Sequence, residues 1–201
     1  SERSEKMRNA AKILAENVDE FAQIMTDEMG KPITDARGEI NKCAWVCNYY
    51  ADHAESFLQD EMAPSDAGKS YVSFQPIGIV LAVMPWNFPY WQVFRFAAPA
   101  LMAGNAGILK HASNVTGCAL AIEDIFQRAG FPKNLFRTLV ASSKQVDAVL
   151  ENPLVRAATL TGSVGAGRAV GSKAGQMLKK SVLELGGSDP YIILDLSLIH
   201  I

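Results

Sequence analysis

The sequence predicts an α/β protein in which a parallel sheet is flanked by helices and preceded by a pair of amino-terminal helices. Two observations support this prediction: two amphipathic helical segments come first, and after residue 78 short apolar runs alternate regularly with helical segments. Strands that alternate with helices of this length are joined by right-handed crossovers, which produce a parallel sheet. Ligands of such sheets bind at the carboxyl ends of the strands.

Six apolar runs predict the strands, and four segments with helical periodicity lie between them. The strands are expected at residues 79–84, 106–109, 136–140, 157–161, 181–185 and 191–194. The helices are expected at residues 91–103, 115–129, 144–151 and 166–180. Before the sheet, apolar residues at helical spacing predict one helix over 8–29 and a second, capped by Thr34, that runs to Leu58.

Composition and charge exclude several classes of protein. The 201 residues carry 19 basic and 21 acidic side chains, so there is no electrostatic reason to expect nucleic acid or an anionic membrane surface as a partner. Residues 70–94 carry no charge, but three prolines interrupt them, and a buried strand followed by a turn explains the run better than a membrane span. Three cysteines, an odd number, predict reduced thiols in a cytoplasmic protein. The histidines lack ligand spacing, so no metal is expected.

A glycine-rich turn, Gly162-Ser163-Val164-Gly165-Ala166-Gly167, lies between a predicted strand and a predicted helix. Glycines let the backbone approach an anion, and a helix N-terminus supplies free amides and a positive dipole end, so the pattern indicates a phosphate or pyrophosphate site. The spacing also matches the start of a P-loop, but Arg168-Ala169 stands where Lys and Ser or Thr are required. A glycine-rich turn without any ligand is the structural alternative.

Two other strand ends carry polar groups. Pro85-Trp86-Asn87-Phe88-Pro89 follows the first long strand, and its prolines restrict the turn that holds the Asn87 amide. Such an amide suits a developing oxyanion; the alternative is an Asn that bonds its own turn. In Glu184-Leu185-Gly186-Gly187, desolvation by apolar neighbours would raise the pKa of Glu184 and suit it to general-base catalysis. A salt-bridged strand-end carboxylate is the alternative there.

The order of these motifs resembles the aldehyde dehydrogenase family, whose members oxidise aldehydes to acids with NAD or NADP, through a thiohemiacetal and a thioester on a cysteine. The likeness rests on the turn at 85–89, Leu109-Lys110, Thr161-Gly162-Ser163 and the motif at 184–187. Two segments, Trp91-Gln92-Val93-Phe94-Arg95 and Leu109-Lys110-His111-Ala112, look like bacterial succinate-semialdehyde dehydrogenases. The resemblance implies an aldehyde-dehydrogenase-like fold with a Rossmann-type parallel sheet.

The resemblance also implies roles for single residues. Asn87 would be an oxyanion-hole donor, and Glu184 the general base that activates the deacylating water. Phe88 and Arg95 would contact the substrate, and the Arg95 guanidinium would hold the distal carboxylate of an ω-carboxylated aldehyde. The implied cofactor-binding residues are Met84, Trp86, Lys110, Ser113, Gly162, Ser163 and Leu185.

Within that cofactor set, the resemblance places Lys110 at the adenosine ribose and Gly162 with Ser163 at the pyrophosphate. Ser113 stands three residues after Lys110, where family members that are strict for NAD often have Glu. Because Ser can donate to a 2′-phosphate that a carboxylate would repel, NADP is expected to be tolerated beside NAD.

The expected organisation has four parts. Residues 1–61 form amino-terminal helices of the cofactor-binding domain, residues 62–78 a Pro- and Ser-rich hairpin or oligomerisation arm, residues 79–195 the NAD(P)-binding α/β domain, and residues 196–201 an atypical tail. The family's second, catalytic domain is not expected within these residues.

The resemblance places the nucleophilic cysteine beyond the 184–187 motif, and none of Cys43, Cys47 or Cys118 matches it. The chain alone is therefore predicted to be inactive, and the full-length protein to be a cytoplasmic homo-oligomer that oxidises an aldehyde, with succinate semialdehyde the expected substrate. The alternatives are a non-catalytic nucleotide-binding or assembly module and, less favoured, a divergent P-loop NTPase.

Overall fold

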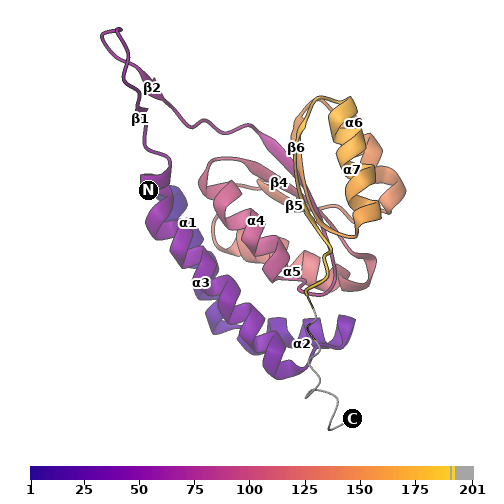
Figure 1. Cartoon of the computed structure of the whole chain (residues 1–201). Helices are drawn as coiled ribbons and strands as arrows, with labels where there is room; N and C mark the ends of the chain where they lie inside the picture. The colour runs from indigo at the N-terminus through magenta and orange to yellow at the C-terminus, as the bar shows by residue number, and fades with distance from the viewer. Residues whose placement is uncertain (191, 193–201) are drawn as a thin grey trace.

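The computed structural model of the chain describes residues 1–190 and 192 (Figure 1). At its centre lies a parallel sheet with the strand order β5-β4-β3-β6-β7. Its strands are β3 (Ile79–Met84), β4 (Ala106–His111), β5 (Phe136–Thr138), β6 (Val155–Gly162) and β7 (Lys180–Leu185). The predicted parallel sheet is confirmed, and each of these strands ends within two residues of its expected bounds. Apart from Ile192, the strand expected at 191–194 falls outside the described residues.

Four helices cover the two faces of this sheet: α4 (Trp91–Met102), α5 (Thr116–Arg128), α6 (Val146–Glu151) and α7 (Val164–Gln176). In Figure 1, α4 and α5 lie on one face, and α6 and α7 on the other. The helix expected at 166–180 begins two residues earlier. It ends at Gln176, because Leu178 takes a left-handed φ of 53° that an α-helix cannot continue, and Lys180 belongs to β7.

Three helices, not the predicted pair, precede the sheet: α1 (Glu2–Glu16), α2 (Val18–Met29) and α3 (Ile33–Phe57). The single helix expected over 8–29 is wrong because Asn17 breaks it: its backbone leaves the helical region, and its Nδ2 donates to the Ile13 carbonyl at 2.8 Å. The Thr34 cap is also wrong. Pro32 occupies the N-cap position of α3, without a side-chain cap bond.

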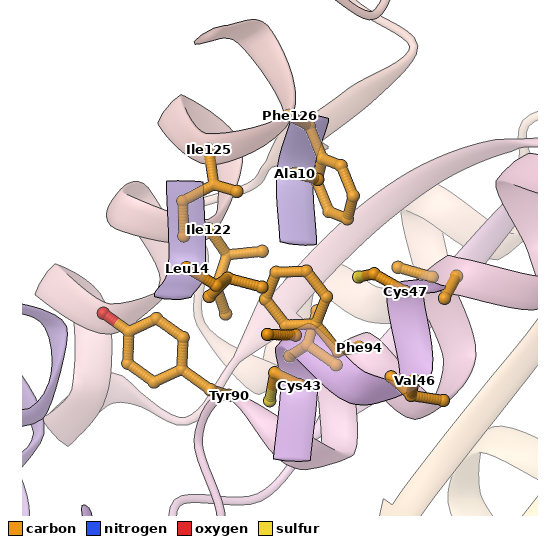
Figure 2. Close-up of a cluster of buried hydrophobic side chains, with 14 of the residues drawn as sticks. Ala10, Leu14, Cys43, Val46, Cys47, Tyr90, Phe94, Ile122, Ile125 and Phe126 are labelled. Atoms are coloured by element: carbon orange, nitrogen blue, oxygen red, sulfur yellow. The ribbon is translucent and has the colours of Figure 1, made fainter. Parts of the chain in front are cut away.

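The amino-terminal helices share one hydrophobic core with α4 and α5. Figure 2 shows Leu14 of α1, Cys43 and Cys47 of α3, Phe94 of α4 and Phe126 of α5 gathered in this cluster. The rings of Phe94 and Phe126 are tilted, with centroids 5.2 Å apart. All three cysteines of the sequence are buried and unpaired. Burial in one core fixes α1–α3 against the face of the sheet that carries α4 and α5.

A two-stranded hairpin connects α3 to β3 and projects away from the rest of the chain (Figure 1). Its strands β1 (Glu61–Met62) and β2 (Tyr71–Val72) pair antiparallel, and both Tyr71 and Val72 are exposed. The alternation of apolar and polar residues in Tyr71-Val72-Ser73-Phe74 predicts a strand, and only its first two residues pair. Across the described residues, no helix has both the length and the apolar character needed to span a bilayer.

Candidate functional site

The carboxyl ends of β3, β6 and β7 lie side by side at one edge of the sheet. In the register, Val83 pairs with Leu160, and Thr161 pairs with Glu184. The chain builds outward from β3 to β4 and β5, and then returns to the other side of β3 with β6 and β7. The edge between β3 and β6 is therefore the switch point of the sheet, where α/β folds bind their ligands.

A hollow of about 430 Å³, here called the switch-point hollow, opens at this edge. It is lined by Pro85, Trp86, Asn87, Thr161, Gly162, Ser163, Glu184, Leu185 and Gly186. Six of the predicted site residues are among them, and they come from three separate strand ends. The fold thus brings together the proposed oxyanion donor, anion site and general base.

The turn from β6 to α7 is very short: β6 ends at Gly162, Ser163 is the N-cap, and α7 begins at Val164. The Ser163 hydroxyl accepts a hydrogen bond from the Ala166 amide at 3.2 Å. A P-loop wraps phosphate with several residues between strand and helix, and only Ser163 stands between them here. The NTPase alternative is therefore wrong for this turn.

The glycines of this turn differ in what they do. A Cβ on Gly167 would lie 2.4 Å from Cδ2 of Leu185, so Gly167 allows α7 to pack closely on the end of β7. Gly162 and Gly165 have no left-handed φ, and a Cβ on either would meet no atom closer than 3.7 Å. Neither backbone strain nor packing explains these two glycines, and Gly162 lines the switch-point hollow.

The turn that carries Asn87 is exposed at its tip. Trp86, Asn87 and Phe88 are all exposed, and no hydrogen bond links the Asn87 side chain to residues 85–89. The alternative of an Asn that bonds its own turn is therefore not what the structure shows. The Lys31 ammonium lies over the Phe88 ring, 3.8 Å from the ring centroid. Phe88 does not line the switch-point hollow.

Glu184 is more exposed than predicted. Its side chain is 56% exposed, and every residue of β7, the last strand of the described sheet, is exposed. The expected desolvation of this carboxylate is wrong for the chain as described. Its Oε2 lies 3.9 Å from Nη2 of Arg95, which matches the salt-bridged alternative.

Arg95 projects from α4 into a second hollow of about 580 Å³, which lies between α4 and the strands β3, β6 and β7. Met84 and Glu184 line the same hollow, and its remaining walls are largely apolar. Besides Glu184, Arg95 contacts Thr161, to which its Nη2 donates at 3.3 Å. Thr161 and Glu184 line both hollows, so the two hollows lie next to each other.

The last two predicted residues lie further along the same edge. Ser113 lines a third hollow of about 380 Å³ beside the carboxyl end of β5, together with Thr138 and Ser142. Lys110 is half-buried near the end of β4 and lines none of these three hollows. The structure therefore does not bring Lys110 and Ser113 into the switch-point hollow.

Sequence reasoning missed three residues that bond the Asn87 turn or the first residues after it: Lys31, Glu39 and His111. His111 entered only as part of a motif, yet it is buried, and its Nε2 lies 2.8 Å from the Pro89 carbonyl oxygen. Glu39 adjoins the apolar stripe of α3, and a carboxylate beside a buried stripe was the one available signal. Within residues 1–190 and 192, no three His, Cys, Asp or Glu side chains come together as metal ligands would.

The fold and the site define an α/β domain with a ligand-sized hollow at its switch point. Comparison of the sequence with known families matches the aldehyde dehydrogenase family over residues 1–197. The chain belongs to the aldehyde dehydrogenase family. This confirms the resemblance and the fold class expected from the motifs.

Individual relatives agree with the family match. The chain is 56% identical over 195 residues to a probable succinate-semialdehyde dehydrogenase [NADP(+)] of Synechocystis, covering 97% of this chain and 43% of that protein. It is 54% identical to succinate-semialdehyde dehydrogenase [NADP(+)] 1 of Mycobacterium tuberculosis, covering 92% and 41%. A solved succinic semialdehyde dehydrogenase of Streptococcus pyogenes, in complex with NADP+, superposes with a TM-score of 0.93 at 42% identity, covering 96% and 43%. The chain thus spans under half the length of each relative.

Proposed function

We propose that this chain is the cofactor-binding part of an enzyme that oxidises succinate semialdehyde to succinate with NADP or NAD. The observation that carries the proposal is the switch-point hollow, where Asn87, Ser163 and Glu184 meet at three strand ends. The names of the Synechocystis and Mycobacterium relatives support this substrate and NADP. We further propose that the enzyme is a cytoplasmic homo-oligomer, with the hairpin of β1 and β2 as its assembly arm.

The described residues fit a dinucleotide. The hollow that Gly162 and Ser163 line and the free amides at the start of α7 suit a pyrophosphate. The hollow at Ser113 lies on the same edge, where the adenosine end would lie, with Lys110 at the ribose. Met84, Trp86 and Leu185 would hold the nicotinamide end. When bound, the nicotinamide would accept a hydride from the substrate carbon.

The chain's own polar groups would act on the substrate at two points. The Asn87 amide would donate a hydrogen bond to the substrate oxygen as negative charge develops there, and would stabilise that charge. The Glu184 carboxylate would accept a proton from the water that attacks the acyl group. Phe88 and Arg95 would contact the remainder of the substrate, with the Arg95 guanidinium facing its distal carboxylate.

Two measurements test this proposal. Calorimetric titration of the chain with NADP, NAD and magnesium ATP should give binding of the nicotinamide nucleotides and none of ATP. A chimera in which the chain is continued after Gly187 by the corresponding remainder of the Synechocystis relative should oxidise succinate semialdehyde with NADP. A folded chimera that binds NADP without turnover would favour the non-catalytic module instead. Failure of the chain to bind either nicotinamide nucleotide would contradict the proposal.

A further inference from the structure

The exposed tip of the turn at 85–89 is held in place by side chains from other elements. An oxyanion donor must be fixed before the reaction, because a donor that has to be oriented during the reaction loses much of its effect. Asn87 has no hydrogen bond to its own turn, so its position depends on what holds the backbone of the turn. Two carbonyl oxygens of the turn, those of Asn87 and Pro89, accept hydrogen bonds from side chains of other elements.

Lys31 holds the first of these carbonyls. Its Nζ donates to the backbone oxygen of Asn87 at 3.1 Å and lies over the Phe88 ring. The Lys31 side chain is only 10% exposed, and it comes from the loop between α2 and α3. The Thr26 hydroxyl donates to the Lys31 carbonyl at 2.9 Å and fixes that loop. A buried ammonium is stable only when paired, and Glu39 is its partner.

Glu39 links Lys31 to the helix that follows the turn. Its side chain is 2% exposed, and one carboxylate oxygen, Oε2, pairs with Lys31. The other, Oε1, accepts the backbone amides of Tyr90 and Trp91 at 2.9 and 2.8 Å. The start of α4 has no side-chain cap of its own, so this carboxylate satisfies amides that would otherwise be unpaired. One buried ion pair thus fixes both the turn and the helix after it.

His111 holds the second carbonyl from the neighbouring strand. Its Nδ1 accepts the Ala112 amide at 2.9 Å, so the proton resides on Nε2, which donates to the Pro89 oxygen at 2.8 Å. The turn is therefore held on two sides, by α3 and by β4. The Asn87 side chain, at the tip, lines the switch-point hollow beside Trp86.

We propose that Lys31 and Glu39 are positioning residues for the oxyanion site: the ion pair fixes the Asn87 peptide and thereby aims its side-chain amide. This inference rests on the role proposed above for Asn87. It predicts that removing Lys31 harms the reaction only when the Asn87 amide is present. A purely structural ion pair would act equally with and without that amide.

The test is a double-mutant cycle in the chimera. Asn87→Ala is expected to lower kcat for succinate semialdehyde about 100-fold, as loss of one oxyanion donor does. Lys31→Met keeps the aliphatic stem beside Phe88 and is expected to lower kcat about 10-fold, with KM for NADP unchanged. In the Asn87→Ala background, Lys31→Met should lower kcat less than about 2-fold, because no amide remains to be positioned.

Two further variants complete the design. Glu39→Gln keeps an acceptor oxygen for the α4 amides but removes the charge partner of Lys31, and it should show the same dependence on Asn87; it completes the cycle if Lys31→Met does not fold. Arg37→Met removes a different ion pair of α3, with Asp19 at 2.6 Å, and should keep the full kcat. Equal losses with and without Asn87 would overturn the positioning role and leave the oxyanion role intact. An Asn87→Ala chimera with full kcat would overturn both.

Discussion

The guanidinium of Arg95 lies 3.9 Å from the carboxylate of Glu184. The sequence assigns these two side chains to different ends of the substrate, yet the structure pairs them across the rim that the two hollows share. Their side chains are 40% and 56% exposed, so solvent screens the pair and little free energy holds it together. A substrate carboxylate that binds Arg95 would take the place of Glu184 and leave that carboxylate free to act on water.

Arg95→Leu should therefore separate two substrates. In the chimera, it is expected to lower kcat/KM for succinate semialdehyde. The loss corresponds to about 2–3 kcal/mol of transition-state stabilisation, the scale of a lost charge-assisted hydrogen bond. Activity on butanal, which lacks the carboxylate, should change little or rise. Arg156→Leu, at the opposite end of β6, is the matched control and should affect neither. Equal losses on both substrates would mean that Arg95 supports the fold.

Much of the fold could be predicted from the sequence because its signals are local. The strand at 79–84 is a six-residue apolar run bounded by Gly78 and Pro85, and the structure keeps those bounds. Asn17 shows where local signals fail. The apolar stripe continues through it, and only the competition between its side chain and the helical hydrogen bonds ends α1 there.

The residues at the strand ends of the site could be predicted from the sequence, but the residues that support them could not. Motif order placed Asn87, Ser163 and Glu184, and the parallel sheet brings their strand ends to one edge. The exposure of Glu184 could not be predicted from its apolar neighbours in the sequence, because it depends on which elements pack against β7. Glu39 lies 51 residues from Tyr90 along the chain, and no local pattern reports such a contact.

Ser113→Glu should select against NADP. Ser113 is exposed in the hollow beside β5, and a carboxylate there would repel a 2′-phosphate while leaving ribose hydroxyls an acceptor. The dissociation constant for NADP is expected to rise about 10-fold, which corresponds to about 1.4 kcal/mol, with that for NAD little changed. Calorimetry on the chain measures both. Ser172→Glu, on the exposed side of α7, adds the same charge elsewhere and should alter neither; equal weakening of both cofactors by Ser113→Glu would argue against this role.

Gly167→Ala should weaken cofactor binding through Leu185. The added Cβ would approach Cδ2 of Leu185 to 2.4 Å, so the Leu185 side chain must move from the wall of the switch-point hollow. We expect NADP binding to weaken several-fold with the melting temperature little changed, because the displaced atoms are the far end of a side chain that is 42% exposed. Gly175→Ala is the control, since a Cβ there meets no atom within 4 Å. Unchanged NADP affinity in Gly167→Ala would show that Leu185 is not needed for binding.

The 201-residue chain should not oxidise aldehydes by itself. Thioester chemistry needs an accessible thiolate, and Cys43, Cys47 and Cys118 are all buried, with burial raising the pKa of each thiol. A thiol reagent such as DTNB should label the native chain slowly, and three thiols should react once guanidinium unfolds it. Turnover of succinate semialdehyde by the purified chain that a thiol reagent abolishes would contradict this prediction.

His111 should make the chain less stable in mild acid. Burial disfavours the imidazolium and lowers the pKa of His111 below its ordinary 6.5. The carbonyls of Pro89 and Met84 and the Glu28 carboxylate favour the charged form and offset part of this effect, and the Lys110 charge disfavours the charged form. Below pH 6.5 the unfolded chain takes up a proton that the folded chain does not, until the pH reaches the lowered folded pKa. The contribution of His111 to the free energy of unfolding is therefore fully present above pH 6.5. Below pH 6.5 the free energy of unfolding falls by up to about 1.4 kcal/mol per pH unit.

His111→Gln removes this titration and keeps a side-chain amide that can donate to the Pro89 carbonyl. Urea unfolding of both chains between pH 5 and 8 should show a shallower acid slope for the variant, and the two slopes should agree above pH 7. The variant His53→Gln is the control, because His53 is exposed on α3, and it should keep the slope of the unchanged chain. An NMR titration of the folded chain measures the His111 pKa directly. A folded pKa at 6.5 would remove the acid destabilisation by His111, and one above 6.5 would reverse it; either result would refute the prediction.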